Sequence, residues 1–81
     1  MKNESLESWL VNEKNMSLRA ARDVVSRQKR VMKLVGSDTI NENTLDLLIS
    51  NKQFLKLSLY IKSQLKRATV LVLEYQESVG E

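Results

Sequence analysis

The side chains of this chain that could bind a ligand are mainly cations, and most of them fall in two short segments. Residues 16–35 carry six Lys or Arg against one Asp, and residues 52–67 carry five Lys or Arg with no Asp or Glu. The net charge of +3 therefore conceals two basic blocks separated by a mildly acidic segment. If folding brought the two blocks together, the local positive field would be much larger than the net charge suggests. The simpler alternative is that these charges only keep helices soluble.

The side chains most often used in catalysis are missing from the chain. There is no His, the commonest general base and metal ligand, and no Cys, so disulfides and thiolate metal sites are excluded. The ten Asp and Glu residues form no recognisable hydrolase or metal-ligand pattern, and the Ser residues have no His or evident Lys partner to activate them. We therefore expect a protein that is not an enzyme and that uses no metal, cofactor or small-molecule substrate.

Length and composition indicate one small folded domain over residues 1–81. A hydrophobic content of 42% is typical of a folded chain rather than a disordered one. The longest apolar run spans residues 70–73, far short of the roughly 20 residues that cross a bilayer. Glu4 and Glu7 stand where a signal peptide would be basic and then apolar. We expect a cytoplasmic protein that does not enter a membrane.

The absence of Pro and the presence of only two Gly favour helices along the whole chain. A first helix is predicted up to about Glu13, capped by Asn3 or Ser5, since both side chains can accept a backbone N–H. Its apolar stripe has the i, i+3, i+4 spacing of a buried face and consists of Leu6, Trp9 and Leu10. We expect Trp9 to be buried in the core rather than to stack on a base.

A second helix is predicted over residues 18–35. Ser17 is suited to cap its start, and Gly36, which readily takes the left-handed conformation, ends it. On a helical wheel one side of this segment is apolar and a separate arc of about 100° is basic. The apolar side consists of Ala21, Val24, Gln28, Val31, Met32 and Val35. The basic side consists of Arg19, Arg22, Ser26, Lys29, Arg30 and Lys33, and Arg27 falls outside it.

Two further helices are predicted in the C-terminal half. Thr39 followed by Glu42 matches the capping box, which predicts a short helix over residues 40–50. A long last helix follows, with Ser58 as its cap or an interior residue, and its apolar stripe consists of Leu57, Ile61, Leu65, Ala68, Val72, Tyr75 and Val79. Residues 69–75 have high β-propensity, but a lone strand would leave its backbone groups without partners, so we expect a helix there.

The adjoining face of the last helix carries polar and basic residues. It consists of Lys62, Ser63, Lys66 and Arg67. Tyr60 lies off the apolar stripe and beside Lys62, so it is the better candidate among the aromatic residues for a surface position near phosphate. Simple packing of Tyr60 is nevertheless the favoured interpretation.

The order of these features resembles a known DNA-binding module. The chain has a short helix with an apolar stripe, then NMS at residues 15–17 opening a long basic helix, then TINENTLDLLIS at 39–50 and LSLYIKSQLKRA at 57–68. This plan is similar to the N-terminal SAM-like core-binding domain of tyrosine recombinases and phage integrases. That family typically has Leu-Ser opening its second helix, which Met16 and Ser17 match here. In the family, Thr, Tyr, Leu and Phe then follow at spacings of three and four residues. In this chain those four positions are held by Ala20, Val24, Gln28 and Val31.

The resemblance implies an all-α fold, a small four-helix SAM-like orthogonal bundle that binds double-stranded DNA. In the family, the second and fourth helices face the phosphates and the groove. Carried over by position, the DNA-binding residues are Ser17, Arg19, Arg22, Ser26, Lys29, Arg30 and Lys33 on the second helix and Lys62, Ser63, Lys66 and Arg67 on the last. The catalytic domain of the recombinases has no counterpart in this sequence, so the resemblance implies a binding module without it.

Two other functions fit the same sequence. The chain could be a small protein-interaction adaptor, or a phage-type regulator or inhibitor, whose basic faces bind an acidic protein partner. Alternatively, the apolar segment VLVLEY at residues 70–75 could form the seam of a homodimer. DNA binding is the leading hypothesis because two basic segments occur in one short chain.

Overall fold

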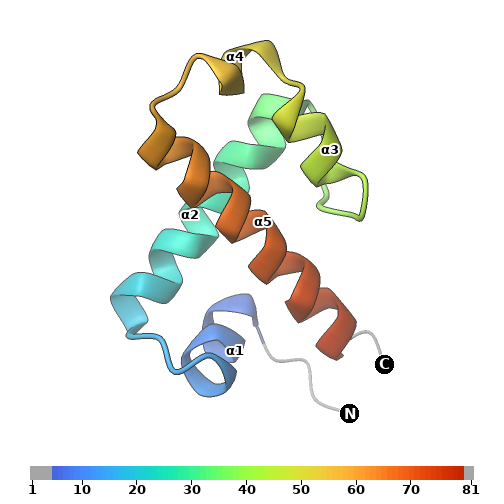
Figure 1. The fold of residues 1–81 in the computed structure, drawn as a ribbon. Coiled ribbons are helices and arrows are strands. Elements are labelled where there is room, and N and C mark those ends of the chain that lie inside the picture. The colour runs from blue at the N-terminus through green and yellow to red at the C-terminus, as the bar shows by residue number, and fades with distance from the viewer. Residues whose placement is uncertain (1–4, 80–81) are drawn as a thin grey trace.

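The computed structural model describes residues 5–79, and this part of the chain is all-helical (Figure 1). It contains no strand and five helices: α1 (Leu6–Glu13), α2 (Leu18–Val35), α3 (Thr44–Ile49), α4 (Lys52–Leu55) and α5 (Leu59–Val79). The predicted all-α class is therefore confirmed, and residues 69–75 are helical as expected. The bounds of α1 and α2 agree with the predicted ones, whereas the region between α2 and α5 differs.

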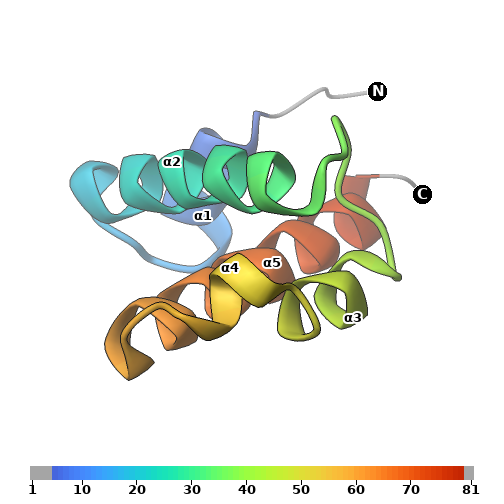
Figure 2. The same cartoon turned by 90° about the horizontal axis from the view of Figure 1, so that it is seen from above.

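The two longest helices, α2 and α5, cross each other at the centre of the molecule (Figure 1). Seen from above, α2 lies on one side and α5 on the other, with α3 and α4 on the level of α5 (Figure 2). Two groups of buried side chains fill the space between them. The first consists of Trp9, Leu10, Ala21, Val24, Ala68 and Leu71. The second consists of Val31, Ile40, Leu48, Phe54, Leu65 and Val72.

The ends of α1 and α2 follow the predicted caps, and of the two roles considered for Ser58 the structure shows the cap. Ser5 and Ser17 accept hydrogen bonds from the N–H groups three residues on, each at 3.1 Å. The alternative first cap, Asn3, lies outside the described residues. Gly36 ends α2 with φ of 71°, a left-handed conformation that costs Gly little. Ser58 caps α5 by accepting the N–H of Ile61 at 3.2 Å.

The predicted start of the third helix is wrong by four residues. α3 begins at Thr44, and Thr39 does not cap it. The reason is a local polar turn: the Asn43 N–H donates to Asn41 Oδ1 at 2.8 Å, and the Asn41 N–H donates to Thr44 Oγ1 at 2.9 Å. Asn and Thr side chains compete in this way with helical backbone bonds, so the chain turns before it becomes helical.

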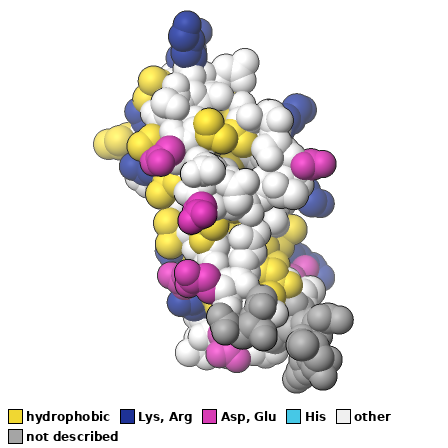
Figure 3. Space-filling model, turned by 90° about the vertical axis from the view of Figure 1, so that its right-hand side faces the viewer, with side chains coloured by type: hydrophobic (Ala, Val, Ile, Leu, Met, Phe, Trp, Pro, Cys, Tyr) yellow, Lys and Arg dark blue, Asp and Glu magenta, His cyan; other side chains and the backbone are white. Residues whose placement is uncertain are grey.

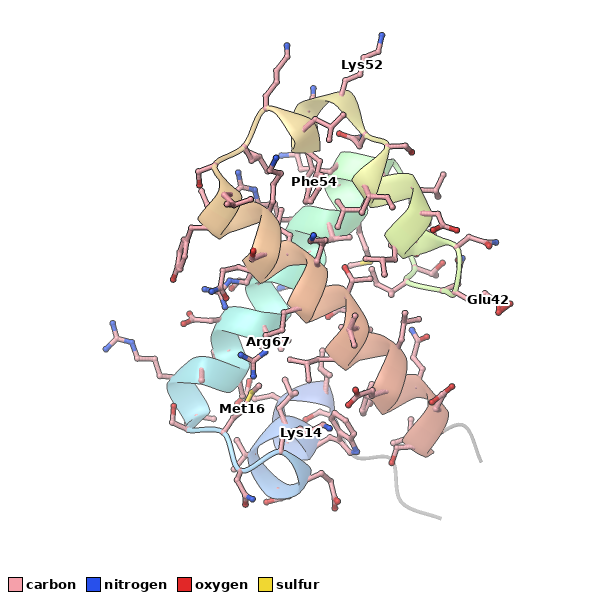
Figure 4. The ribbon with its side chains drawn as sticks, viewed as in Figure 1. Lys14, Met16, Glu42, Lys52, Phe54 and Arg67 are labelled. Atoms are coloured by element: carbon pink, nitrogen blue, oxygen red, sulfur yellow. The ribbon has the colours of Figure 1, made fainter. Side chains whose placement is uncertain are left out.

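The single-turn helix α4 replaces the predicted connection between the third and last helices. Asn51 caps it by accepting the N–H of Phe54 at 2.9 Å, and its side-chain amide donates to the carbonyl of Leu34 at the same distance. That second bond satisfies one of the carbonyls that the end of α2 leaves without a helical partner. Phe54 points inward from α4 (Figure 4) and is buried. Asn51 thus joins the end of α2 to the turn that delivers Phe54 to the core.

Trp9 holds α1 against the C-terminal half of α5. Its side chain is 5% exposed, as predicted, and its ring meets that of Tyr75 edge to face with centroids 5.7 Å apart. The indole Nε1 donates to Ser78 Oγ at 3.2 Å. Lys14 lies over the same ring and pairs with Glu74 at 2.6 Å. Because the indole is both packed and hydrogen-bonded, it fixes where the first helix sits.

The burial of Trp9 predicts a blue-shifted tryptophan emission that iodide quenches poorly. Since this is the single Trp of the chain, fluorescence reports on α1 alone. Unfolding in urea should move the emission to that of free tryptophan and restore quenching. An emission like that of free tryptophan in the native protein would show that α1 does not dock.

Phe54 and Leu55 provide a matched test of the core. Phe54→Ala should destabilise the protein by about 3–5 kcal/mol, the usual cost of truncating a buried Phe, which is as large as the whole stability expected for a chain of this size. The helical circular dichroism signal of the Phe54→Ala variant should therefore be lost. Leu55→Ala, on the neighbouring residue that is 54% exposed, should change the free energy of unfolding by about 0.5 kcal/mol or less. Equal effects of the two substitutions would contradict the placement of α4.

Candidate functional site

The basic side predicted for the second helix is exposed along its whole length. The buried residues of α2 are Ala21, Val24 and Val31, and they face α1 and α5. The residues on the opposite side, which we call the α2 outer face, are all exposed and consist of Arg19, Arg22, Ser26, Lys29, Arg30 and Lys33. From Arg19 to Lys33 this face is about 21 Å long. Ser17 is also exposed, but its hydroxyl caps the helix.

Four of the five cations on the α2 outer face have no carboxylate partner in the part of the chain that the structure describes. Only Arg22 forms an ion pair, with its Nε 3.7 Å from Glu7 Oε2. The four without an ion pair are Arg19, Lys29, Arg30 and Lys33. Exposed cations with no internal partner keep their charge and donors available for an external anion.

The second basic segment occupies the first half of α5 and faces away from the α2 outer face. Leu65, Ala68 and Val72 are buried on the side of α5 that packs against α2. The outer sides of the two helices therefore face away from each other (Figure 2). Ser63 and Lys66 are exposed on the outer side of α5, and Lys62 is half-buried. Packing α2 against α5 therefore does not join the two basic blocks into one flat surface.

One predicted residue of α5 does come close to α2. Arg67 lines a hollow of about 250 Å³ at the edge where the two helices cross, together with Arg27 of α2. Figure 4 shows Arg67 extending over the start of α2 near Met16. The whole lining consists of Met16, Ala20, Asp23, Val24, Arg27, Gln64, Arg67 and Ala68. The sequence pattern did not identify Arg27, because the helical wheel places it outside the basic side. Only the crossing of α2 with α5 places Arg27 beside Arg67 in the lining of the hollow.

The favoured interpretation of Tyr60, simple packing, is wrong. Its side chain is 69% exposed, and the neighbouring Leu59 is 79% exposed. Tyr60 is followed by Gln64 and Arg67 at spacings of four and three, so it shares the side of α5 that lines the hollow. The exposed ring of Tyr60 therefore lies on the same side of α5 as Gln64 and Arg67, about one turn before Gln64.

The apolar residues proposed for a homodimer seam are mostly used by the chain itself. Leu71 and Val72 are buried in the two groups of core side chains, and Leu73 and Tyr75 pack against those groups. Val70 alone of the four apolar residues from 70 to 73 is exposed. The seam is therefore reduced to a single exposed Val on the outer side of α5.

Carboxylates gather on another side of the molecule. Figure 3 shows the side that carries α3, where Asp and Glu side chains spread over the surface while Lys and Arg lie at its margins. Glu42 projects from the loop before α3 on this side (Figure 4). The surface potential is therefore uneven, and a polyanion would be repelled from the α3 side.

Within residues 5–79, no three His, Cys, Asp or Glu side chains gather where they could hold a metal ion. None of the described helices is both long enough and apolar enough to span a bilayer. The feature that stands out is the row of four α2 cations without an ion pair in the described part of the chain, with the hollow beside it.

Comparison of the chain with family models, with curated proteins and with solved structures gives no match.

Proposed function

We propose that the chain binds duplex DNA through the α2 outer face. The observation that carries the proposal is a row of four exposed cations that form no ion pair within residues 5–79, presented over about 21 Å by one helix. Duplex DNA carries one negative charge per roughly 1.7 Å of its axis, and Lys and Arg that neutralise phosphates release condensed counterions. Affinity of this kind depends little on sequence and falls steeply with salt.

The rigidity of α2 supports this proposal. Its start is capped by Ser17, its end by Gly36, and its buried side contributes to both groups of core side chains. A helix fixed in this way loses little conformational freedom when it meets a partner, so less of the binding free energy is spent on ordering. Arg residues on it can also pair in bidentate fashion with guanine if the helix enters the major groove.

The relationship to integrase core-binding domains belongs to the same proposal. It is supported by the helix order, with a short apolar helix, a long basic helix and a long last helix that crosses it. The SAM-like bundle and the cytoplasmic location are proposed with it. Because the outer sides of α2 and α5 face away from each other, the contact is centred on α2. Lys62, Ser63 and Lys66 then lie away from the principal DNA surface, and Arg67 lies at its edge.

An adaptor function is the second candidate, and one observation favours it. The outer side of α5 carries exposed Leu59 and Val70 on either side of Lys66. Apolar side chains on the same outer side of a helix offer contact area to another protein, and the cation between them favours an acidic one. This candidate uses α5, whereas DNA binding uses α2, so substitutions on the two helices separate them.

Reversing Lys29 and Lys33 to Glu should reduce affinity for a short DNA duplex by more than tenfold. Two lost phosphate contacts should also reduce the slope of log affinity against log salt by about two. Fluorescence anisotropy with a labelled duplex at several salt concentrations measures both quantities. Lys33 lies in the last turn of α2, so its reversal costs about 0.3–1 kcal/mol of helix stability, which thermal melting by circular dichroism will register.

The matched control is the reversal of Lys52 and Lys56 to Glu. Both are exposed residues at the α4 end, Lys52 points away from the molecule in Figure 4, and the net charge change is identical. This variant should keep most of the affinity and the full salt slope. Equal losses in the two variants would show that only net charge matters. If the wild-type chain binds no DNA at low salt but captures an acidic protein through α5, the adaptor function takes first place.

A further inference from the structure

We infer that the hollow between α2 and α5 holds one backbone phosphate of the bound nucleic acid, with Arg27 and Arg67 as its ligands. This inference rests on the proposed DNA binding and extends it, because it assigns a phosphodiester site to residues from two helices. It also gives a role to Arg27, which lies outside the basic side of α2. Arg27 and Arg67 come from different helices and line the same hollow because α2 and α5 cross there.

The donors in the hollow are available to an anion. No Asp or Glu oxygen of residues 5–79 lies within ion-pair distance of the Arg27 or Arg67 guanidinium. The amide of Gln64, on the same side of α5, supplies a further donor. Arg presents its donors in a planar fork that matches phosphate geometry, so two Arg side chains from different helices can hold one phosphate from two directions.

The surroundings of the hollow strengthen such a contact. Arg27 is half-buried, and half of the eight lining residues are apolar: Met16, Ala20, Val24 and Ala68. In a partly desolvated site the attraction between a guanidinium group and a phosphate is stronger than on an open surface. The volume of about 250 Å³ equals that of about eight water molecules, so a phosphate can enter with its sugar or with bridging water.

Asp23 is the one carboxylate in the lining and opposes an anion there. With two Arg and one Asp, the formal charge of the lining is positive by one. Asp23 precedes Arg27 by four residues, a spacing at which the two can pair on a helix, yet their charged atoms are not within ion-pair distance. Asp23 therefore weakens the site, and removing its charge should strengthen phosphate binding.

The hollow is continuous with the α2 outer face. Arg19, Asp23, Arg27 and Arg30 follow one another at spacings of four, four and three, so they form one row along α2. Arg19 and Arg30 belong to the α2 outer face, while Asp23 and Arg27 line the hollow. A nucleic-acid strand lying along the outer face can therefore place one phosphate between Arg27 and Arg67.

The test compares the Arg27→Gln/Arg67→Gln double variant with Lys52→Gln/Lys56→Gln, which removes the same charge at the α4 end. Anisotropy with a 20-base-pair duplex should show about tenfold weaker binding for the first variant and a salt slope lower by about one, the value for a single phosphate. The second variant should keep the wild-type slope. Asp23→Asn should bind DNA more tightly than the wild-type chain.

Two further measurements distinguish loss of the phosphate site from misfolding of a variant and from absence of DNA binding. Arg67 is exposed, so Arg67→Gln alone should fold normally and still bind about threefold more weakly, even if Arg27→Gln disturbs the fold. Titration of the wild-type chain with inorganic phosphate should shift the Arg27 and Arg67 Nε–H signals in nuclear magnetic resonance spectra before those of other Arg residues. Unchanged affinity and slope in Arg67→Gln and in a folded double variant would overturn the phosphate site while leaving DNA binding through α2 intact. Absence of any DNA binding by the wild-type chain at 50 mM salt would overturn both.

Discussion

The rest of the structure depends on the packing of α2 against α5. Val24 and Val31 on one helix, and Leu65, Ala68 and Val72 on the other, bring together the two groups of buried side chains that form the core. This contact decides which side of α2 faces solvent. Where the helices separate beside the crossing, the small side chains Ala20 and Ala68 leave volume unfilled, and the hollow lies there. One packing interaction therefore produces both the exposed basic face and the adjoining hollow.

The short elements serve to hold that crossing in place. α1 is fixed by Trp9, which packs on Tyr75 and donates to Ser78 near the end of α5. At the other end of the molecule, Asn51 donates to the carbonyl of Leu34. Near the end of α5, Gln76 donates to the carbonyl of Ile40 at 2.8 Å and ties the loop before α3 to α5. In a chain this small, where a single core contributes little net stability, such polar contacts between segments restrict how α2 and α5 can slide past each other.

The charges are distributed unevenly, so that the molecule has an acidic side and a basic side. Asp and Glu side chains spread over the side that carries α3 (Figure 3), whereas the α2 cations that form no ion pair within residues 5–79 lie on the side turned away from the core. An approaching polyanion is repelled at one surface and attracted at another, which orients the encounter before any specific contact forms. The net charge of +3 alone would not reveal this polarity.

The sequence by itself determined the all-α class, the bounds of α1 and α2, the capping roles of Ser17 and Gly36, and the burial of Trp9. These features depend on interactions within about one helical turn, or on an apolar stripe whose period can be read directly. The start of α3 and the existence of α4 were not predicted. The local turn of Asn41 with Asn43 and Thr44 competes with the capping box at Thr39. Asn51 bonds to the carbonyl of Leu34, which only the fold brings within reach. The tertiary structure alone decided how the two basic blocks lie. Helical periodicity places a residue on a face of its own helix, but the crossing of α2 and α5 turns Lys66 away from the α2 outer face and brings Arg67 to the same hollow as Arg27.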